Sequence, residues 1–205
     1  MGVLGSGLQD AKHYEDALSV KEAELSMERR LDAPEEQILC VQNNLAISYV
    51  RLRRFEEALC LRESVYSGTL RLYGEEHEDT VLEAFNYADD LAKNEHFEEA
   101  KALMRKTLPV ARRVFGENHE DMLRLRWSYA GALCQDPAAT LADLREAVTT
   151  LEDTASTARR VFGGTHPLTV DIGKSLRESR EALSARDGGV SAIREAVAAM
   201  TARGA

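Results

Sequence analysis

The sequence has few of the residues that build catalytic, metal-binding or disulfide-stabilised sites. Its 205 residues include three cysteines, Cys40, Cys60 and Cys134, and no two of them form the close pair that a zinc site uses. Separated cysteines in odd number are typical of free thiols in a reducing compartment. Neither a G-x-S-x-G nucleophile elbow nor a G-x-x-x-x-G-K-[ST] phosphate loop is present. We therefore expect a non-enzymatic protein with no catalytic residue, no metal ion and no cofactor.

Aromatic residues and long apolar runs are also scarce. Aromatic residues make up 6% of the chain and apolar residues 44%, so the core must consist mainly of leucine, alanine and valine. No apolar run approaches the roughly 20 residues that are needed to span a bilayer. No charged start followed by an apolar segment and a cleavage site marks a signal peptide. These absences predict an intracellular, cytoplasmic protein, and a location facing an organelle stays open.

Positive charge is in deficit as well. The net charge is −9 and the isoelectric point is about 5.2. Affinity for a phosphate backbone comes from neutralising many phosphates with lysine and arginine, so we expect no nucleic-acid partner. The N-terminal residues match the pattern M-G-x-x-x-[ST], with Gly2 and Ser6 at the positions that myristoylation requires. No polybasic segment adds the second signal for stable anchoring, so we expect an unmodified N-terminus, with N-myristoylation at Gly2 as the alternative.

Small residues recur at a fixed distance. Ala46, Ala88 and Ala130 are separated by steps of 42 residues, and each lies in a stretch with the apolar periodicity of a helix. A second alanine in each unit, at Ala58 and Ala100 for example, begins a second amphipathic stretch after a short polar turn. Self-similarity at such a period indicates stacked repeats, each of which buries its apolar face on its neighbours.

Glycines mark the ends of these units. The motifs LYG, VFG and VFG end at Gly74, Gly116 and Gly163, with steps of 42 and 47 residues. The five extra residues fall in a loop around 136–139, between the two helices of the third complete unit. A histidine follows each glycine three residues later, and repeat spacing keeps these side chains one unit apart. We expect local hydrogen bonding from them rather than metal binding: His77, His119 and His166.

The register divides the chain into an N-terminal segment and one array. We expect residues 1–7 to be flexible and the glycines at 188 and 189 to end a helix, which gives about nine helices in all. The incomplete first repeat should leave the helix near Tyr14, Leu18 and Leu25 with apolar surface uncovered. The array comprises residues 8–205, with an incomplete first repeat at 8–33, repeats at about 35–75, 77–117 and 119–164, and a C-terminal repeat or cap at 167–203.

The segments NNLAISYVRLRRFEEAL, YGEEHEDTV, VFGENHEDM and VFGGTHPLTV carry a family resemblance. They resemble tetratricopeptide repeats (TPRs) of the 42-residue, kinesin-light-chain-like kind over residues 8–185. The resemblance implies an all-α, right-handed superhelical solenoid of antiparallel helix pairs. The heptad coiled coil of kinesin light chains is not recognisable here. The aromatic residue expected four positions after the F-E-E-A alanine is replaced by Arg62 in one unit and by Met104 in the next.

In this family the first helix of each pair lines the concave wall, where partner peptides or helices dock. The resemblance implies that asparagines there bond a partner's backbone and that basic residues receive acidic side chains. Two aromatic residues, Phe85 and Trp127, would make the middle of the groove apolar, unless they pack against neighbouring helices. The candidate groove residues by register are Asn43, Asn44, Arg51, Phe85, Asn86, Lys93, Arg124 and Trp127.

The resemblance therefore implies a scaffold or adaptor that binds protein partners and catalyses no reaction. In the first hypothesis a partner peptide or helix lies in the concave groove. In the second the chain is a structural subunit built stably into a large multiprotein assembly, which it contacts through the outer faces and the ends of the solenoid.

Overall fold

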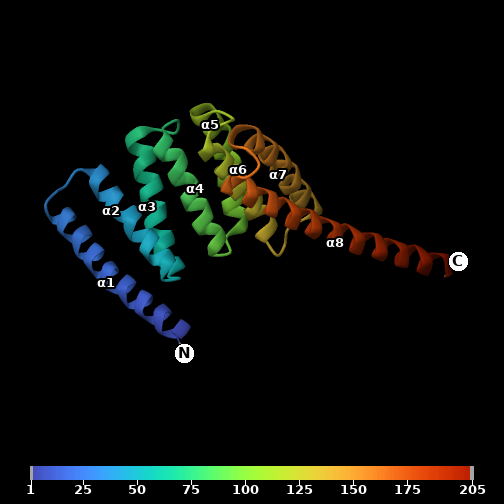
Figure 1. Cartoon of the computed structure of the whole chain (residues 1–205), viewed down its shortest axis with the longest axis horizontal. Coiled ribbons are helices and arrows are strands. Elements are labelled where there is room, and N and C mark those ends of the chain that lie inside the picture. The colour runs from blue at the N-terminus through green and yellow to red at the C-terminus, as the bar shows by residue number, and fades with distance from the viewer. Residues whose placement is uncertain (1, 204–205) are drawn as a thin grey trace. The chain divides into compact units, whose positions relative to one another are not determined.

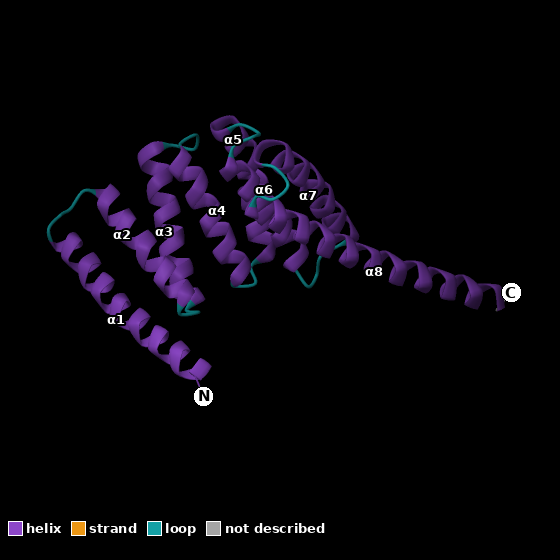
Figure 2. Cartoon of the chain, viewed as in Figure 1, coloured by secondary structure: helices purple, strands orange, loops and turns teal. Residues whose placement is uncertain are grey.

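The computed structural model describes the backbone of residues 2–203 and the side chains of residues 15, 16 and 18–189. Every regular element in this part of the chain is a helix, so the all-α prediction is confirmed (Figure 2). Short turns join consecutive helices. The longest connection, residues 136–140, lies where the sequence carries its insertion. The helices are α1 (Gly2–Arg30), α2 (Glu35–Arg51), α3 (Phe55–Tyr73), α4 (Glu78–Lys93), α5 (Phe97–Phe115), α6 (Glu120–Gln135), α7 (Leu141–Phe162) and α8 (Pro167–Arg203).

The chain forms two compact units, which divide between Val114 and Phe115. In the N-terminal unit α1 packs on α2, α2 on α3 and α3 on α4, so helices adjacent in sequence are adjacent in space (Figure 1). In the C-terminal unit α7 packs against both α6 and α8. Each unit thus follows the sequential pairing that a repeat array requires.

Small residues lie where paired helices come together. The alanines that set the register have no exposed surface, so their small side chains are fully buried at helix contacts. Gly68 of α3 also allows a close helix contact, because a Cβ added there would lie 2.5 Å from a methyl carbon of Leu39 on α2. These contacts let the helices approach closely without a void. The fully buried alanines of the register include Ala46, Ala58, Ala88, Ala100, Ala130 and Ala147.

The N-terminal helix is packed by the chain itself. Leu18 and Leu25 are buried in a cluster with Val41 and Leu45 of α2. The hydroxyl group of Tyr49 donates a hydrogen bond of 2.6 Å to Glu22 of α1 and adds a polar contact to the same interface. The expectation that Leu18 and Leu25 are uncovered was wrong, because α2 presents a complementary apolar face to them, and the side chain of Tyr14 lies outside the described residues.

Three equivalent turns connect successive repeats with one hydrogen-bonding device. In the turn before α6, Gly116 has φ of 79°, in the left-handed region that favours glycine. The ring of His119 stacks on Phe115 with centroids 5.3 Å apart, and its Nδ1 accepts a 3.3 Å hydrogen bond from the backbone N–H of Asp121. The local hydrogen bonding predicted for the histidines is thereby confirmed, because His77 and His166 repeat both contacts.

The C-terminal helix differs from the sequence prediction. α8 continues through Gly188 and Gly189, so the stop expected there was wrong, and eight helices are described instead of nine. Neither glycine has a positive φ, and a helix tolerates each at a cost of about 1 kcal/mol relative to alanine. The helix is tied down just before them, since Arg186 donates to the carbonyl oxygen of Ala139 at 2.9 Å. At the other end, α1 begins at Gly2, within the glycine-rich segment for which the sequence predicts flexibility.

We predict that His119→Ala lowers the free energy of unfolding by about 1 kcal/mol, because the first turn of α6 loses a side-chain acceptor. His119→Asn is the matched control, since asparagine supplies an acceptor at the same position. Hydrogen exchange of the amides at residues 120–123, together with urea unfolding, measures both effects. Equal losses for the alanine and asparagine variants would show that the ring stacking, not the cap, stabilises this turn.

Candidate functional site

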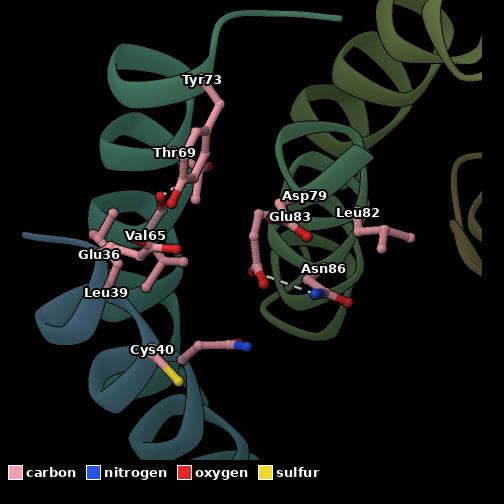
Figure 3. A pocket seen from close by; sticks show the side chains of 11 residues that line it. Glu36, Leu39, Cys40, Val65, Thr69, Tyr73, Asp79, Leu82, Glu83 and Asn86 are labelled. Atoms are coloured by element: carbon pink, nitrogen blue, oxygen red, sulfur yellow. Dashed lines mark hydrogen bonds between the residues drawn. The ribbon is translucent and has the colours of Figure 1, made fainter. Parts of the chain in front are cut away.

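A cavity of about 490 Å³ opens in the N-terminal unit between α2 and α3 on one side and α4 on the other. Figure 3 shows Glu83 and Asp79 of α4 across the gap from Tyr73, Thr69 and Val65 of α3. The first helices α2 and α4 supply most of its walls, and the second helix α3 supplies its floor. Its lining residues are Glu36, Leu39, Cys40, Asn43, Val65, Thr69, Tyr73, Asp79, Leu82, Glu83 and Asn86.

A second, smaller cavity of about 280 Å³ continues along the same helices. It shares Asn86 with the first cavity and lies nearer the C-terminal ends of α2 and α4. We call the two cavities together the α2–α4 groove. The second cavity is lined by Ile47, Val50, Arg51, Arg62, Asn86, Asp89, Asp90 and Lys93.

A buried arginine on α3 joins the walls of this groove. The side chain of Arg62 is 7% exposed, and its Nε donates to Asp90 at 3.0 Å. Its Nη1 donates to Glu83 at 3.2 Å and also to the side-chain oxygen of Asn43 on α2. One guanidinium therefore holds α2, α3 and α4 together by charge-assisted hydrogen bonds.

Lys93 completes the cluster from the end of α4. Its Nζ lies 2.9 Å from Asp90 and 2.7 Å from Asp89. Burial by itself would lower the pKa of Lys93, but the bonds to these two carboxylates outweigh burial and raise it. Burial also raises the pKa of Glu83, against the opposing effect of Arg62. We call Arg62, Glu83, Asp89, Asp90 and Lys93 the Arg62 cluster, and it holds three carboxylates against two cations.

The structure brings four of the predicted groove residues to these cavities. Asn43 and Asn86 line the first cavity, and Arg51, Asn86 and Lys93 line the second. The side chain of Asn43 already accepts from Arg62, and that of Asn86 donates to Glu83 at 3.2 Å. Lys93 is paired with Asp89 and Asp90, so the groove is less basic than the register alone indicates.

Two further candidates on the same helices lie outside the cavities. Asn44 is exposed, and its backbone carbonyl accepts from Lys21 of α1 at 3.2 Å, so it belongs to the α1 side of α2. Phe85 is 4% exposed and lines neither cavity. The alternative reading of Phe85, as a ring packed among helices, fits its burial better than an anchor for a partner.

The remaining two candidates lie in the C-terminal unit. Arg124 is exposed and forms an ion pair at 2.5 Å with Glu120, one turn earlier in α6. Trp127 is half-buried, and its Nε1 donates a 2.9 Å hydrogen bond to Ser175 of α8. The indole thus fastens α6 to α8, which is a packing role of the kind that the sequence left open.

The Arg62 cluster is the feature that the sequence did not reveal. The repeat register shows Arg62 in place of an aromatic residue, at a position that faces the interior. A charge at a buried position requires counter-charges, and Asp90 is 3% exposed. That requirement was the available signal, but residues 62, 83 and 90 are too far apart in sequence for periodicity to pair them.

We predict that Arg62→Met lowers the free energy of unfolding by about 3–5 kcal/mol, because Glu83 then stays buried without a cation and Asp90 keeps only Lys93. Arg113→Met is the matched control, since the ion pair between Arg113 and Glu76 is exposed and contributes about 0–1 kcal/mol. Urea unfolding followed by circular dichroism measures both. A loss below about 1 kcal/mol for Arg62→Met would show that the cluster is not a stabilising constraint.

Two kinds of site are absent from the part of the chain whose side chains are described. No three histidine, cysteine or acidic residues there lie close enough to hold a metal ion. No helix in that part has the length and apolar character to cross a membrane.

The family model for the tetratricopeptide repeat matches residues 41–79 and 86–121. The fold is similar to that of a putative kinesin light chain from Podosopora anserina with nearly identical TPR-like repeats: the TM-score is 0.73 at 19% identity, covering 97% of this chain and 93% of that one. A point variant of the same protein gives 0.74 at 20% identity, with coverage of 98% and 93%.

BtubC (BKLC) from P. vanneervenii is also similar, with a TM-score of 0.68 at 16% identity over 94% of this chain and 76% of that chain. A search of curated proteins finds no match. Residues 41–79 and 86–121 thus match the tetratricopeptide repeat, and the chain has a TPR-like fold similar to that of the putative kinesin light chain.

Proposed function

We propose that the chain is a non-enzymatic scaffold or adaptor that binds a peptide or helix of a protein partner in the α2–α4 groove. The observation that carries this proposal is the pair of adjoining cavities along the first helices. Together they offer room for more than one side chain of a partner, in the mixed polar and apolar setting that suits recognition.

The geometry favours a partner that lies along the groove. Asn86 lines both cavities. Its side-chain amide, which donates to Glu83, has further hydrogen-bonding groups for the backbone of a partner. The Arg62 cluster holds α2, α3 and α4 in fixed relation, so the walls are formed before a partner arrives. A preformed site loses less conformational freedom on binding, which favours affinity.

The cysteines support an intracellular, cytoplasmic location. Cys40, Cys60 and Cys134 are all free thiols in this structure, and Cys40 and Cys60 are exposed. Exposed unpaired thiols persist in a reducing compartment. The unmodified N-terminus, with myristoylation at Gly2 as the alternative, stays a prediction that no contact tests, because the side chains near the N-terminus lie outside the described residues.

We predict that Cys40→Phe weakens groove binding roughly tenfold or more, because a ring on α2 would fill the first cavity. Cys60→Phe is the matched control, since Cys60 is equally a surface cysteine but lines neither cavity. Peptides selected from a random display library on the full chain would be titrated against both variants by fluorescence anisotropy. Binding that survives Cys40→Phe unchanged would rule out the first cavity as the docking site.

An exposed apolar stripe on α1 favours the second candidate function, a structural subunit in a large assembly. Val20 and Met27 are seven residues apart and share one face of α1, opposite the face that packs on α2, and Leu31 follows directly after the end of the helix. They are 68%, 51% and 69% exposed. Apolar side chains grouped in this way mark a contact surface.

We predict that, if this stripe is a stable interface, the purified chain self-associates through it and the Val20→Glu/Met27→Glu variant is monomeric. Both residues are exposed, so the variant should unfold at the same urea concentration as the unchanged chain. Val170→Glu is the control, because Val170 is an exposed apolar residue of α8, in the C-terminal unit. Sedimentation velocity measures the mass, and a monomeric unchanged chain at high concentration would remove the support for this candidate.

A further inference from the structure

We propose that the first cavity of the α2–α4 groove receives an arginine side chain from the partner segment. This inference rests on the proposed function and adds the chemistry of the partner. It also reverses the expectation drawn from the repeat register, in which basic groove residues would select an acidic partner.

The charge of the cavity lining is negative. Glu36 of α2 and Asp79 and Glu83 of α4 all line it, and none of the eleven lining side chains is a lysine or an arginine. Arg62 reaches Glu83 from the α3 side, but it is shared with Asp90 and does not line this cavity. An entering cation would therefore meet a carboxylate surplus.

Other roles account for part of this charge but not for all of it. Glu36 and Asp79 stand in the first turns of α2 and α4, where carboxylates stabilise a helix. Stabilisation of a helix by these carboxylates does not require a cavity beside them. Glu83 lies beyond the first turn of α4, with 12% of its side chain exposed, and its burial opposes ionisation. A cation bound in the cavity would add a second cation beside this carboxylate, which Arg62 and Asn86 contact from within the chain.

The basic residues of the groove are not placed to attract an acidic partner instead. Lys93 lies between Asp89 and Asp90, which neutralise it. Arg62 is 7% exposed and already donates to Asp90, Glu83 and Asn43. Of the basic residues that the repeat register predicted for partner binding, Lys93 is neutralised within the chain and Arg51 lines only the second cavity, so the charge of the first cavity stays negative.

The shape of the cavity fits a long side chain with several donors. Leu39 and Val65 line it and provide apolar surface for the methylene groups of an arginine, while the charged head meets the carboxylates. The described carboxylates are not grouped closely enough to hold a metal ion. A guanidinium presents five N–H donors in a planar fork and spans separated carboxylates, which a small ion does not.

The test uses peptides selected from a random display library on the full chain and retained only if Cys40→Phe blocks them. For the tightest of these, a twin peptide carries citrulline, the neutral isostere, at its arginine. We expect arginine to be enriched in the retained set, and the citrulline twin to bind roughly tenfold or more weakly.

A charge-removed variant locates the effect. In Glu36→Gln/Asp79→Asn, the difference between the arginine and citrulline peptides should shrink by most of its value, since both carboxylates leave the cavity while the Arg62 cluster stays intact. The matched control is Glu56→Gln/Glu63→Gln, which removes the same charge from exposed positions of α3 outside both cavities and should leave the difference unchanged.

Three results would overturn the inference. Retained peptides without arginine enrichment, or with a citrulline twin that binds equally, would refute it while leaving the groove function standing. A lysine twin that binds as tightly as the arginine peptide would refute the assignment of a guanidinium. A library that yields no peptide blocked by Cys40→Phe would contradict both the inference and the proposed function.

Discussion

The close approach of helices at small residues is the constraint on which the rest of the structure depends. Ala46, Ala58, Ala88 and Ala100 have no exposed surface, and Gly68 faces Leu39 where a Cβ would clash. Larger residues at these positions would separate the helices and open voids, at a cost that close-packed interiors do not tolerate. The spacing of α2, α3 and α4, and hence the width of the groove, follows from these contacts.

Within that frame the Arg62 cluster exchanges apolar packing for directed polar contacts. An aromatic ring at this position would fill space without fixing direction, whereas a guanidinium holds Asp90, Glu83 and Asn43 at defined distances. The cluster also determines which charges stay available to a partner. Since Lys93 and Arg62 both pair with carboxylates of the chain, the negative lining of the first cavity stays available to a partner.

Much of the fold could be predicted because its signals are local. Three turns with an aromatic residue, a glycine and a histidine at fixed spacing predicted the helix boundaries and the local hydrogen bonding of His77, His119 and His166, which the structure shows to be helix capping. The candidate site was predicted less completely. Asn43, Asn86, Arg51 and Lys93 were placed at the groove by register alone, but register carries no information about whether their side chains are already engaged. Phe85 and Trp127 illustrate the limit, since a ring on the expected face turned out to be buried or hydrogen-bonded to another helix.

The sequence by itself determined the repeat period, the helix pairs and the small residues at their contacts, because periodicity and turn chemistry act over a few residues. Tertiary structure alone decided that Arg62 finds its counter-ions on α4, 21 and 28 residues later in the chain. It also decided that the helix continues through Gly188 and Gly189, because contacts such as that between Arg186 and Ala139 hold the preceding turn. Both outcomes depend on which side chains meet across helices, and that is fixed by packing, not by sequence order.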